Sequence, residues 1–342
     1  MTKTAFITGI TGQDGAYLAK YLQAIGGYNI VGLARRSSSL NLSRLEKLRV
    51  DINSIQIEYF DLIEPFNIQR LLSKYQPTEI YNLAAQTFVS TSLDVPLYTM
   101  EVNSTGVYRF VETIMNTDMN IKFYQACTSE MFGQAETSPQ CEQTILHPRS
   151  PYGVAKVAAY WYVKSARENR GFFGCNGITY NHESPLRGTE FVTKKITSGL
   201  ANIKFNNGNS IKLGDINAKR DWGHASDFVR AMHSMLQYNT ADDYVISSEE
   251  CHSIKEFCEI AAAYLDYELI WSGNGINAKG IDYSTGKVLI EIDPKFFRPA
   301  DGKTLIGDST KARKILNWHR EFTFKDLVTD MIKSDAEKFC GN

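Results

Sequence analysis

Short apolar runs alternate with segments of helical periodicity along the first half of the chain. The runs that predict strands cover residues 4–8, 29–34, 55–60, 79–84 and 122–127, and residues 16–25 have apolar positions at helical spacing. Strands separated by helices indicate parallel βαβ units. The pattern therefore predicts an α/β fold with a Rossmann-type doubly wound parallel sheet, whose ligands lie beyond the carboxyl ends of the strands.

The second half of the chain has a more irregular pattern. It predicts a strand at residues 210–213, helices at 253–265, 309–316 and 324–338, and a Gly-, Asn- and Ser-rich surface loop at 272–286. Ser309 and Thr323 are the expected N-caps of the last two helices. We expect residues 1–180 to form mainly the sheet domain and residues 181–342 mainly a smaller, irregular α/β lobe, with a segment at about 210–250 returning to the sheet domain.

Composition excludes several classes of protein. The 342 residues carry a formal net charge of −1, which draws the chain neither to nucleic acid nor to a membrane surface. No apolar stretch is long enough for a transmembrane helix, and the N-terminus lacks the pattern of a signal peptide. The six cysteines are scattered without zinc-site spacing, which indicates a reducing cytoplasm and no metal.

A glycine pattern follows the first predicted strand. Gly9, Gly12 and Gly15 occupy the turn that leads into the first helix, where glycines let the backbone approach a pyrophosphate at the helix N-terminus. Their spacing differs from the common Gly-x-Gly-x-x-Gly fingerprint. A purely structural turn remains an alternative, but the strand–turn–helix context favours nucleotide binding.

The end of the second predicted strand indicates which nucleotide binds. An NAD enzyme commonly has an acidic residue there for the ribose 2′-hydroxyl. This chain has Arg35 and Arg36, followed by Ser37. Two guanidinium groups suit a 2′-phosphate, so the sequence predicts NADP. A solvated basic turn is the alternative interpretation.

Tyr152 and Lys156 form a Tyr-x-x-x-Lys pair on one face of a predicted helix. A lysine ammonium there favours the phenolate and lowers the pKa of the tyrosine, which can then take a proton from a sugar hydroxyl. The pattern also occurs by chance in many helices. Glu130, after the fifth predicted strand, would add a second acid/base group if it shares the site.

Other polar residues are weaker candidates. Asn181 and His182 follow an apolar run, where they either hydrogen-bond a ligand or cap a turn. Arg220 and Arg298 suit a diphosphate, although surface arginines usually have no specific ligand.

Together these residues resemble the extended short-chain dehydrogenase/reductase family and, within it, the GDP-mannose 4,6-dehydratases. The resemblance covers about residues 3–335. It is carried by residues 9–15, 35–39, 149–156, 181–185, 191–196, 218–224 and 298–299. It implies a GDP-sugar substrate, NADP as cofactor, and a homodimer or homotetramer in which the Arg35–Arg36 loop reaches the cofactor site of a neighbouring subunit.

The resemblance also implies roles for individual residues. The catalytic set is Thr128, Glu130, Tyr152 and Lys156. Expected cofactor contacts are Gly9, Gly12, Gln13, Asp14, Gly15, Arg35, Arg36, Ser37, Asp61, Leu62, Leu83, Ala85, Thr87, Tyr98, Lys156, His182 and Arg187. Expected substrate contacts are Thr87, Glu130, Asn181, Lys195, Arg220, Arg298 and Asp301.

The implied reaction is redox-neutral. Tyr152, aided by Lys156 and Thr128, removes the 4-hydroxyl proton as hydride leaves C4. Glu130 then removes the C5 proton and protonates the departing 6-hydroxyl. Hydride returns to C6, and C5 is reprotonated.

Three residues depart from the family pattern. Cys127 replaces a serine, Phe88 a histidine and Asp301 a glutamate. Because of Phe88 and Asp301, a related GDP-heptose remains an alternative substrate. A nucleotide-sugar reductase or epimerase is the alternative enzyme, and a non-enzymatic NADP-binding protein the alternative outside enzymes.

Overall fold

The computed structural model describes residues 2–297 and 304–340, and this part of the chain divides into two compact units. The first unit contains the residues up to Tyr180, Ala225–Ser247 and Gly307–His319. The second contains Asn181–His224, Ser248–Ile306 and the residues from Arg320 onward. The later segment that belongs to the sheet unit therefore starts at Ala225 rather than near residue 210, and a further segment joins it after Ile306.

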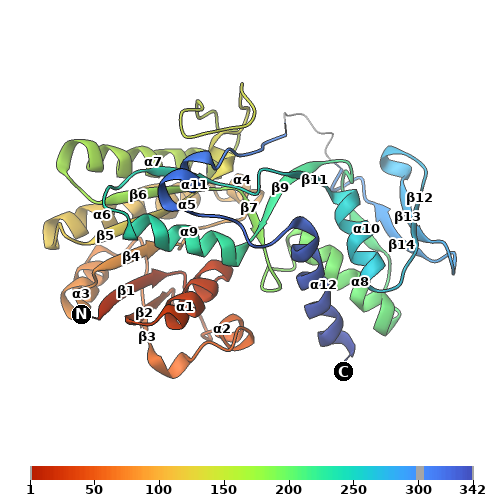
Figure 1. Ribbon diagram of the computed structural model, residues 1–342, viewed down its shortest axis with the longest axis horizontal. Helices are drawn as coiled ribbons and strands as arrows, with labels where there is room; N and C mark the ends of the chain where they lie inside the picture. Colours follow the sequence, from red (N-terminus) through yellow and green to blue (C-terminus); the bar gives the residue numbers. More distant parts are fainter. Residues whose placement is uncertain (1, 298–303, 341–342) are drawn as a thin grey trace. The chain divides into compact units, whose positions relative to one another are not determined.

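The first unit is built on a parallel sheet with seven strands in the order β10-β6-β5-β4-β1-β2-β3 (Figure 1). Its strands are β1 Lys3–Thr8, β2 Tyr28–Ala34, β3 Ile55–Tyr59, β4 Glu79–Asn82, β5 Lys122–Thr128, β6 Gly174–Thr179 and β10 Asp243–Ile246. Each neighbouring pair is parallel. The predicted fold class and the five predicted strands are confirmed, with ends shifted by one or two residues.

Helices cover both faces of this sheet. The first unit contains α1 Gln13–Ile25, α2 Ser43–Lys47, α3 Pro65–Tyr75, α4 Thr91–Asp94, α5 Pro96–Met100, α6 Gly106–Thr117, α7 Pro151–Arg170, α9 Ala225–Gln237 and α11 Thr310–Leu316. A π-helical turn, η2 Glu101–Thr105, precedes α6, and short 3₁₀ turns lie at η1 Ile52–Ser54 and η3 Ser129–Met131. Helices α1 and α9 pack together, whereas α3, α6 and α7 share the core of the other face.

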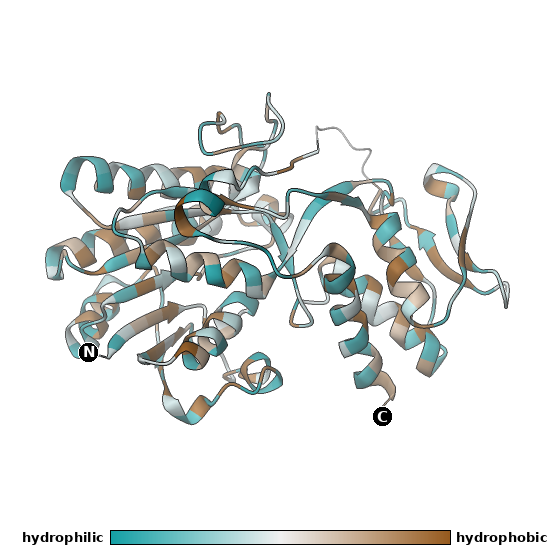
Figure 2. Cartoon of the chain, viewed as in Figure 1, coloured by the Kyte–Doolittle hydropathy of each residue, from teal (hydrophilic) through white to brown (hydrophobic). Residues whose placement is uncertain are grey.

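The core explains why these segments form the sheet. Phe6, Val31 and Phe123 project from three strands into one apolar cluster, where they meet Phe110 of α6 and Val163 of α7. All five side chains are almost fully buried. Much of this sheet is brown in Figure 2, which marks hydrophobic residues. Such strands are typical of a parallel sheet that helices cover on both sides.

The second unit contains two smaller sheets. One has the order β11-β9-β7, formed by Cys251–Ser253, Lys219–His224 and Asn181–Glu183; the other has the order β12-β13-β14-β8, formed by Leu269–Ser272, Lys279–Asp282, Val288–Ile292 and Ile211–Leu213. Its helices are α8 Val192–Asn206, α10 Ile254–Tyr264 and α12 Phe324–Cys340, and η4 Gly275–Asn277 is a 3₁₀ turn. The three helices pack on one another, and Trp222 stacks on Phe324 within their shared core.

Two local predictions for the second half were wrong. The segment predicted as a surface loop at 272–286 contains β13, which pairs with the antiparallel strands β12 and β14. Ser309 does not cap α11 with its side chain, because its hydroxyl is buried and accepts a hydrogen bond from the Ser247 amide. Asp308 instead accepts from the Thr310 amide. At α12, the predicted cap is confirmed, since the Thr323 hydroxyl accepts from the Asp326 amide.

A buried ion pair anchors α7 on the sheet. Both terminal nitrogens of Arg167 lie 2.9 Å from the carboxylate oxygens of Asp243, on edge strand β10. The same carboxylate accepts hydrogen bonds from Tyr160 of α7 and Asn176 of β6. Burial alone would raise the pKa of Asp243, but the Arg167 hydrogen bonds and charge outweigh it and hold that pKa below its usual value.

We expect Arg167→Met to lower the free energy of unfolding by about 3–5 kcal/mol at neutral pH, because the buried carboxylate loses both guanidinium hydrogen bonds and keeps a more distant cation, Lys164, at 3.6 Å. Arg170→Met on the same helix is the matched control. Its pair with Glu112 lies at the surface and should contribute little. Because the folded pKa of Asp243 lies below its unfolded value, this stability is lost as the pH falls through the folded value. Urea unfolding of both variants at several pH values measures the difference; equal losses would contradict the anchor.

Candidate active site

The glycine turn after β1 leaves no room for side chains. Gly9 has a φ of 67°, and its amide donates to the Leu33 carbonyl at 2.9 Å. The Gly12 amide donates back to the Gly9 carbonyl at 2.8 Å. A Cβ added at Gly15 would lie 2.4 Å from the Gly9 carbonyl oxygen and 2.7 Å from the Cα of Ile10. The turn therefore brings the bare backbone to the N-terminus of α1, which attracts anions.

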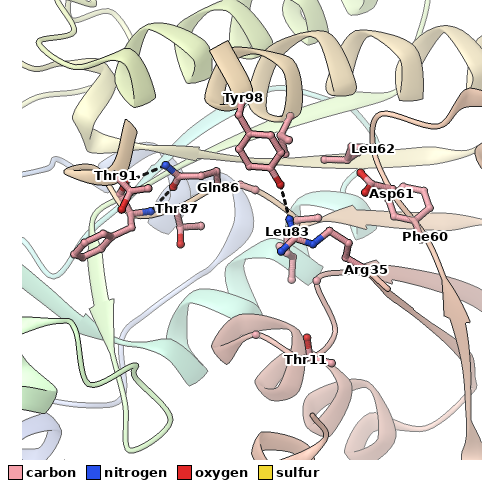
Figure 3. A pocket seen from close by; sticks show the side chains of 16 residues that line it. Thr11, Arg35, Phe60, Asp61, Leu62, Leu83, Gln86, Thr87, Thr91 and Tyr98 are labelled. Carbon is pink, nitrogen blue, oxygen red and sulfur yellow. Dashed lines mark hydrogen bonds between the residues drawn. The ribbon is translucent and has the colours of Figure 1, made fainter. Parts of the chain in front are cut away.

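A cavity of about 480 Å³ opens beside this turn (Figure 3). Of the predicted cofactor residues, those that line it are Gly9, Gly12, Arg35, Asp61, Leu62, Leu83, Ala85, Thr87 and Tyr98. Its remaining walls are Thr11, Phe60, Ala84, Gln86, Phe88, Thr91 and Val102. The lining residues follow β1, β2, β3 and β4 or lie on the helices after β4, so the cavity has the position at the strand ends that the sequence predicts.

Cationic side chains lie at one end of the cavity. Arg35 donates a hydrogen bond to the Tyr98 hydroxyl, and Figure 3 shows the two side chains pointing toward one another. Arg36 lies over the Tyr59 ring, 5.1 Å from its centroid, and donates to the Ser37 carbonyl at 3.0 Å. Both guanidinium groups are exposed at the end of β2 and can reach an anionic ligand.

The remaining first-unit cofactor candidates lie near the turn without lining the cavity. Gln13, Asp14 and Gly15 form the first turn of α1, where the Gln13 side chain donates to the Asp14 carboxylate at 3.2 Å. The Ser37 hydroxyl donates to the Ser39 carbonyl at 2.6 Å, so it helps to shape the loop after β2.

The segments that carry the predicted catalytic residues pack together at the end of β5. The Thr128 hydroxyl accepts a hydrogen bond from the Glu130 amide at 3.2 Å and starts the turn η3. Ser150 caps α7 by accepting from the Gly153 amide at 3.1 Å. A Cβ on Gly153 would lie 2.9 Å from the Glu130 carbonyl oxygen. The glycine beside Tyr152 thus lets α7 approach the segment that carries Glu130.

Lys156 lies one helical turn below Tyr152. Its ammonium donates to the Ala126 carbonyl at 2.7 Å and lies 5.9 Å from the centroid of the Tyr152 ring. The side chain is buried, which lowers the pKa of Lys156 to about 8, although its interaction with Cys127 opposes this shift. Burial raises the pKa of the Cys127 thiol to about 12. At neutral pH, Lys156 is therefore a cation that lies beside the neutral thiol of Cys127.

The second unit holds the other predicted ligand residues. Asn181 and His182 lie on β7 and pair with Trp222 and Gly223 of β9, the strand that also carries Arg220. They therefore form a strand rather than a turn. The exposed Arg220 donates to the Lys219 carbonyl at 2.7 Å. Arg187 stacks on the Phe191 ring at 3.5 Å and lies 3.0 Å from the Glu183 carboxylate.

Lys195, on α8, lies 4.2 Å from the centroid of the Phe296 ring. Partial burial lowers the pKa of Lys195, with Asp293 opposing the shift. Arg298 and Asp301 lie outside the residues that the structure describes.

Several residues that shape the site were missed. Asn103, buried in η2, accepts from the Gln86 amide at 2.8 Å and donates to the Gln86 carbonyl at 2.7 Å, which fixes the loop that lines the cavity. Its sequence context is an ordinary helical pattern, so no local signal marks it. Gly153, by contrast, was visible between the serine cap and Lys156.

The described residues contain neither a membrane-spanning helix nor a cluster of metal-binding side chains. No helix there is long and apolar enough to cross a membrane. No group of three or more His, Cys, Asp or Glu side chains in the same ranges is arranged to hold a metal ion.

Comparison with known proteins matches the sequence to one family. The family model described as GDP-mannose 4,6 dehydratase matches residues 6–331. The chain is 44% identical to GDP-mannose 4,6 dehydratase of Drosophila melanogaster, over 98% of this chain and 86% of that protein. It is 43% identical to GDP-mannose 4,6-dehydratase of Vibrio cholerae, over 98% and 95%.

Solved structures share the fold at low sequence identity. A complex of RMD from Pseudomonas aeruginosa with NADPH has a TM-score of 0.77 at 21% identity, covering 98% of this chain and 100% of that chain. The dTDP-glucose 4,6-dehydratase of Bacillus anthracis in complex with NAD has a TM-score of 0.80 at 18% identity, covering 98% and 97%. At these identities the likeness establishes the fold alone.

We expect Gly15→Ala to weaken dinucleotide binding by about 10–100-fold, since overpacking typically costs about 1–3 kcal/mol. Gly12→Ala is the graded comparison, because its Cβ would approach the Gly9 carbonyl oxygen only to 3.1 Å. Fluorescence titration with NADPH measures both affinities, and thermal unfolding checks that each variant is folded. Equal affinities of wild type and Gly15→Ala would contradict the tight turn.

Proposed function

Because the chain belongs to the GDP-mannose 4,6-dehydratase family, we propose that it converts GDP-D-mannose to GDP-4-keto-6-deoxy-D-mannose and water. The observation that carries this proposal is the close approach of the Glu130 segment to the helix of Tyr152 and Lys156. A reductase or 4-epimerase also uses the tyrosine and lysine, but its reaction removes no C5 proton and so needs no carboxylate for that step.

The residues around the cavity fit a nicotinamide dinucleotide. The glycine turn forms a cradle that any Cβ at Gly15 would fill, and the α1 N-terminus favours a pyrophosphate. Arg35 and Arg36 are the residues that would hold a 2′-phosphate, so we propose NADP as cofactor. When bound, it supplies the hydride acceptor for C4 and the hydride donor for C6.

Tyr152 is the proposed base for the 4-hydroxyl. With a pKa of about 8, Lys156 is mostly protonated at neutral pH, and its charge favours the Tyr152 phenolate. The phenolate oxygen takes the hydroxyl proton, while the Thr128 hydroxyl orients the sugar oxygen by hydrogen bonding. Both protein groups are set on rigid elements, at the ends of α7 and β5, which limits misalignment.

Glu130 is the proposed acid/base group for elimination. Once C4 is a ketone, the C5 hydrogen is acidic, and the Glu130 carboxylate can remove it. The same carboxyl group then gives its proton to the departing 6-hydroxyl, which leaves as water. C5 regains a proton at the end, and the proton that Tyr152 took from the 4-hydroxyl balances it. A single carboxylate serves both steps because C5 and C6 are neighbouring atoms.

The second unit supplies the proposed contacts to the GDP-sugar. Asn181, Lys195 and Arg220, together with Arg298, are cations or amides suited to a diphosphate and a base. His182 and Arg187 are proposed to contact the cofactor. We further propose a homodimer or homotetramer, in which the Arg35–Arg36 loop reaches the cofactor site of a neighbouring subunit.

The first test is incubation of the purified protein with GDP-mannose, NADP⁺ and no reductant. We expect a product lighter by one water, measured by mass spectrometry, with no net change in NADPH absorbance. Replacement of NADP⁺ by NAD⁺ should slow the reaction, because the two arginines lose their phosphate partner. A GDP-heptose arm tests the alternative sugar, since Phe88 lines the cavity. Net NADPH consumption would instead indicate a reductase.

The second test separates the two proton-transfer groups. We expect Glu130→Gln to lower dehydration by about 10²–10⁴-fold, the usual contribution of a general acid/base. Oxidation at C4 should persist, and single-turnover NADPH absorbance measures it. Tyr152→Phe is the comparison variant, in which the absorbance change should disappear as well. Normal dehydration by Glu130→Gln would exclude the role proposed for Glu130.

A further inference from the structure

The Ala126 carbonyl receives two buried donors. Lys156 donates to it at 2.7 Å, and the Gln125 side-chain amide donates to it at 3.0 Å. Gln125 is 1% exposed and Lys156 is 3% exposed. Two donors on one carbonyl in a low-dielectric interior fix the position of both.

A line of hydrogen bonds holds Gln125 in place. Its side-chain oxygen accepts from the Asn82 amide at 2.8 Å. The Asn82 oxygen in turn accepts from the Thr8 hydroxyl at 2.9 Å. The Thr8 oxygen accepts from the backbone amides of Leu83 and Ala84, both at 2.9 Å. These contacts run across β1, β4 and β5, from the residue before Gly9 to the lysine on α7.

The sheet register explains why side chains are used here. Pairing of β4 with β5 stops at Asn82 and Gln125, whereas β6 continues beside β5 as far as Thr128. Ala126 thus lies just beyond the last β4–β5 pair, where the chain after β4 turns away toward the cavity. The amides of Asn82 and Gln125 take over the connection between the strands at this level.

We propose that Gln125, held by Asn82 and Thr8, is a positioning residue for Lys156. It fixes the carbonyl on which the ammonium rests, and it ties that carbonyl to the strand that carries the glycine turn. The placement of the lysine is thereby coupled to the placement of the dinucleotide turn. The kinetic part of this inference rests on the proposed function, whereas the position and titration of Lys156 do not.

The titratable groups that face Lys156 are few. Cys127 on β5 is a neutral thiol, since burial raises its pKa to about 12, and Tyr152 is on the same helix as the lysine. Gln125 is uncharged. Gln125→Glu would keep an acceptor for Asn82 but would place a carboxylate beside the ammonium, which favours its charged form.

The experiment follows the Lys156 signal by NMR in substrate-free protein with ¹³C-labelled lysine, assigned with Lys156→Arg. In Gln125→Glu the titration midpoint should rise by at least about one pH unit. In Gln125→Met the Lys156 signal should move at fixed pH, because the carbonyl has lost one donor. The proposal is overturned if, in folded variants, the Lys156 midpoint is unchanged in Gln125→Glu and the Lys156 signal is unchanged in Gln125→Met. If Gln125→Glu does not fold, Gln125→Met alone decides the proposal.

Gln140→Met is the matched control. Gln140 is also fully buried, accepts from the Tyr180 hydroxyl at 2.8 Å and donates to the Thr137 carbonyl at 2.6 Å. The Gln140→Met variant removes buried hydrogen bonds similar to those of Gln125, in the same unit but away from β5. The Lys156 signal should stay unchanged in this variant, and an equal shift would show a merely structural effect.

The kinetic arm uses GDP-mannose turnover. Gln125→Met should lower kcat by about tenfold, with KM changed by less than about twofold, because misplacement of a catalytic group affects the chemical step. Equal loss of kcat in Gln140→Met would contradict positioning. If the wild-type protein does not turn over GDP-mannose, the proposed function fails, and the Lys156 titration still decides this inference.

Discussion

A steric constraint between α7 and the end of β5 governs the arrangement of the proposed catalytic groups. The missing side chain of Gly153 admits the Glu130 carbonyl to a distance at which any Cβ would clash. Because Tyr152 precedes this glycine and Lys156 lies one turn further, the approach sets all three chemical groups at once. About four turns after Gly153, Arg167 holds the same helix to Asp243 of β10 and to the Gly174 carbonyl of β6. One helix thus has a close contact at its start and an ionic anchor near its end.

Burial then determines the charge of each group in this region. The interior lowers the pKa of Lys156 but leaves it cationic near neutrality, and it raises the pKa of Cys127 far above that range. Asp243 stays charged because Arg167 pairs with it. The carbonyl of Ala126 is the immediate acceptor for the buried ammonium. The acceptor of the buried ammonium is therefore a backbone dipole rather than a carboxylate, which leaves the charge of Lys156 available to a phenolate.

The sequence predicted those parts of the molecule that depend on local patterns. Five strands, the glycine turn and the helix of Tyr152 and Lys156 follow from periodicity and spacing. Strand β13 was missed because its partners β12 and β14 are what make that short polar segment a strand. Ser309 resembles a cap by sequence, yet a tertiary contact with Ser247 takes its hydroxyl. Asn103 and Gln125 act across long sequence separations, so no single-segment pattern reveals them.

Cys127 illustrates how a change from the family pattern can leave the chemistry intact. A serine there would be a neutral hydroxyl, and the buried thiol is neutral as well, since its pKa is raised to about 12. The thiol donates to Asn176 at 3.5 Å, and Asn176 also binds the Asp243 carboxylate that anchors α7. The charge of Lys156 lowers the pKa of Cys127, but burial outweighs this effect. The thiol therefore stays neutral beside the lysine, as a serine hydroxyl would.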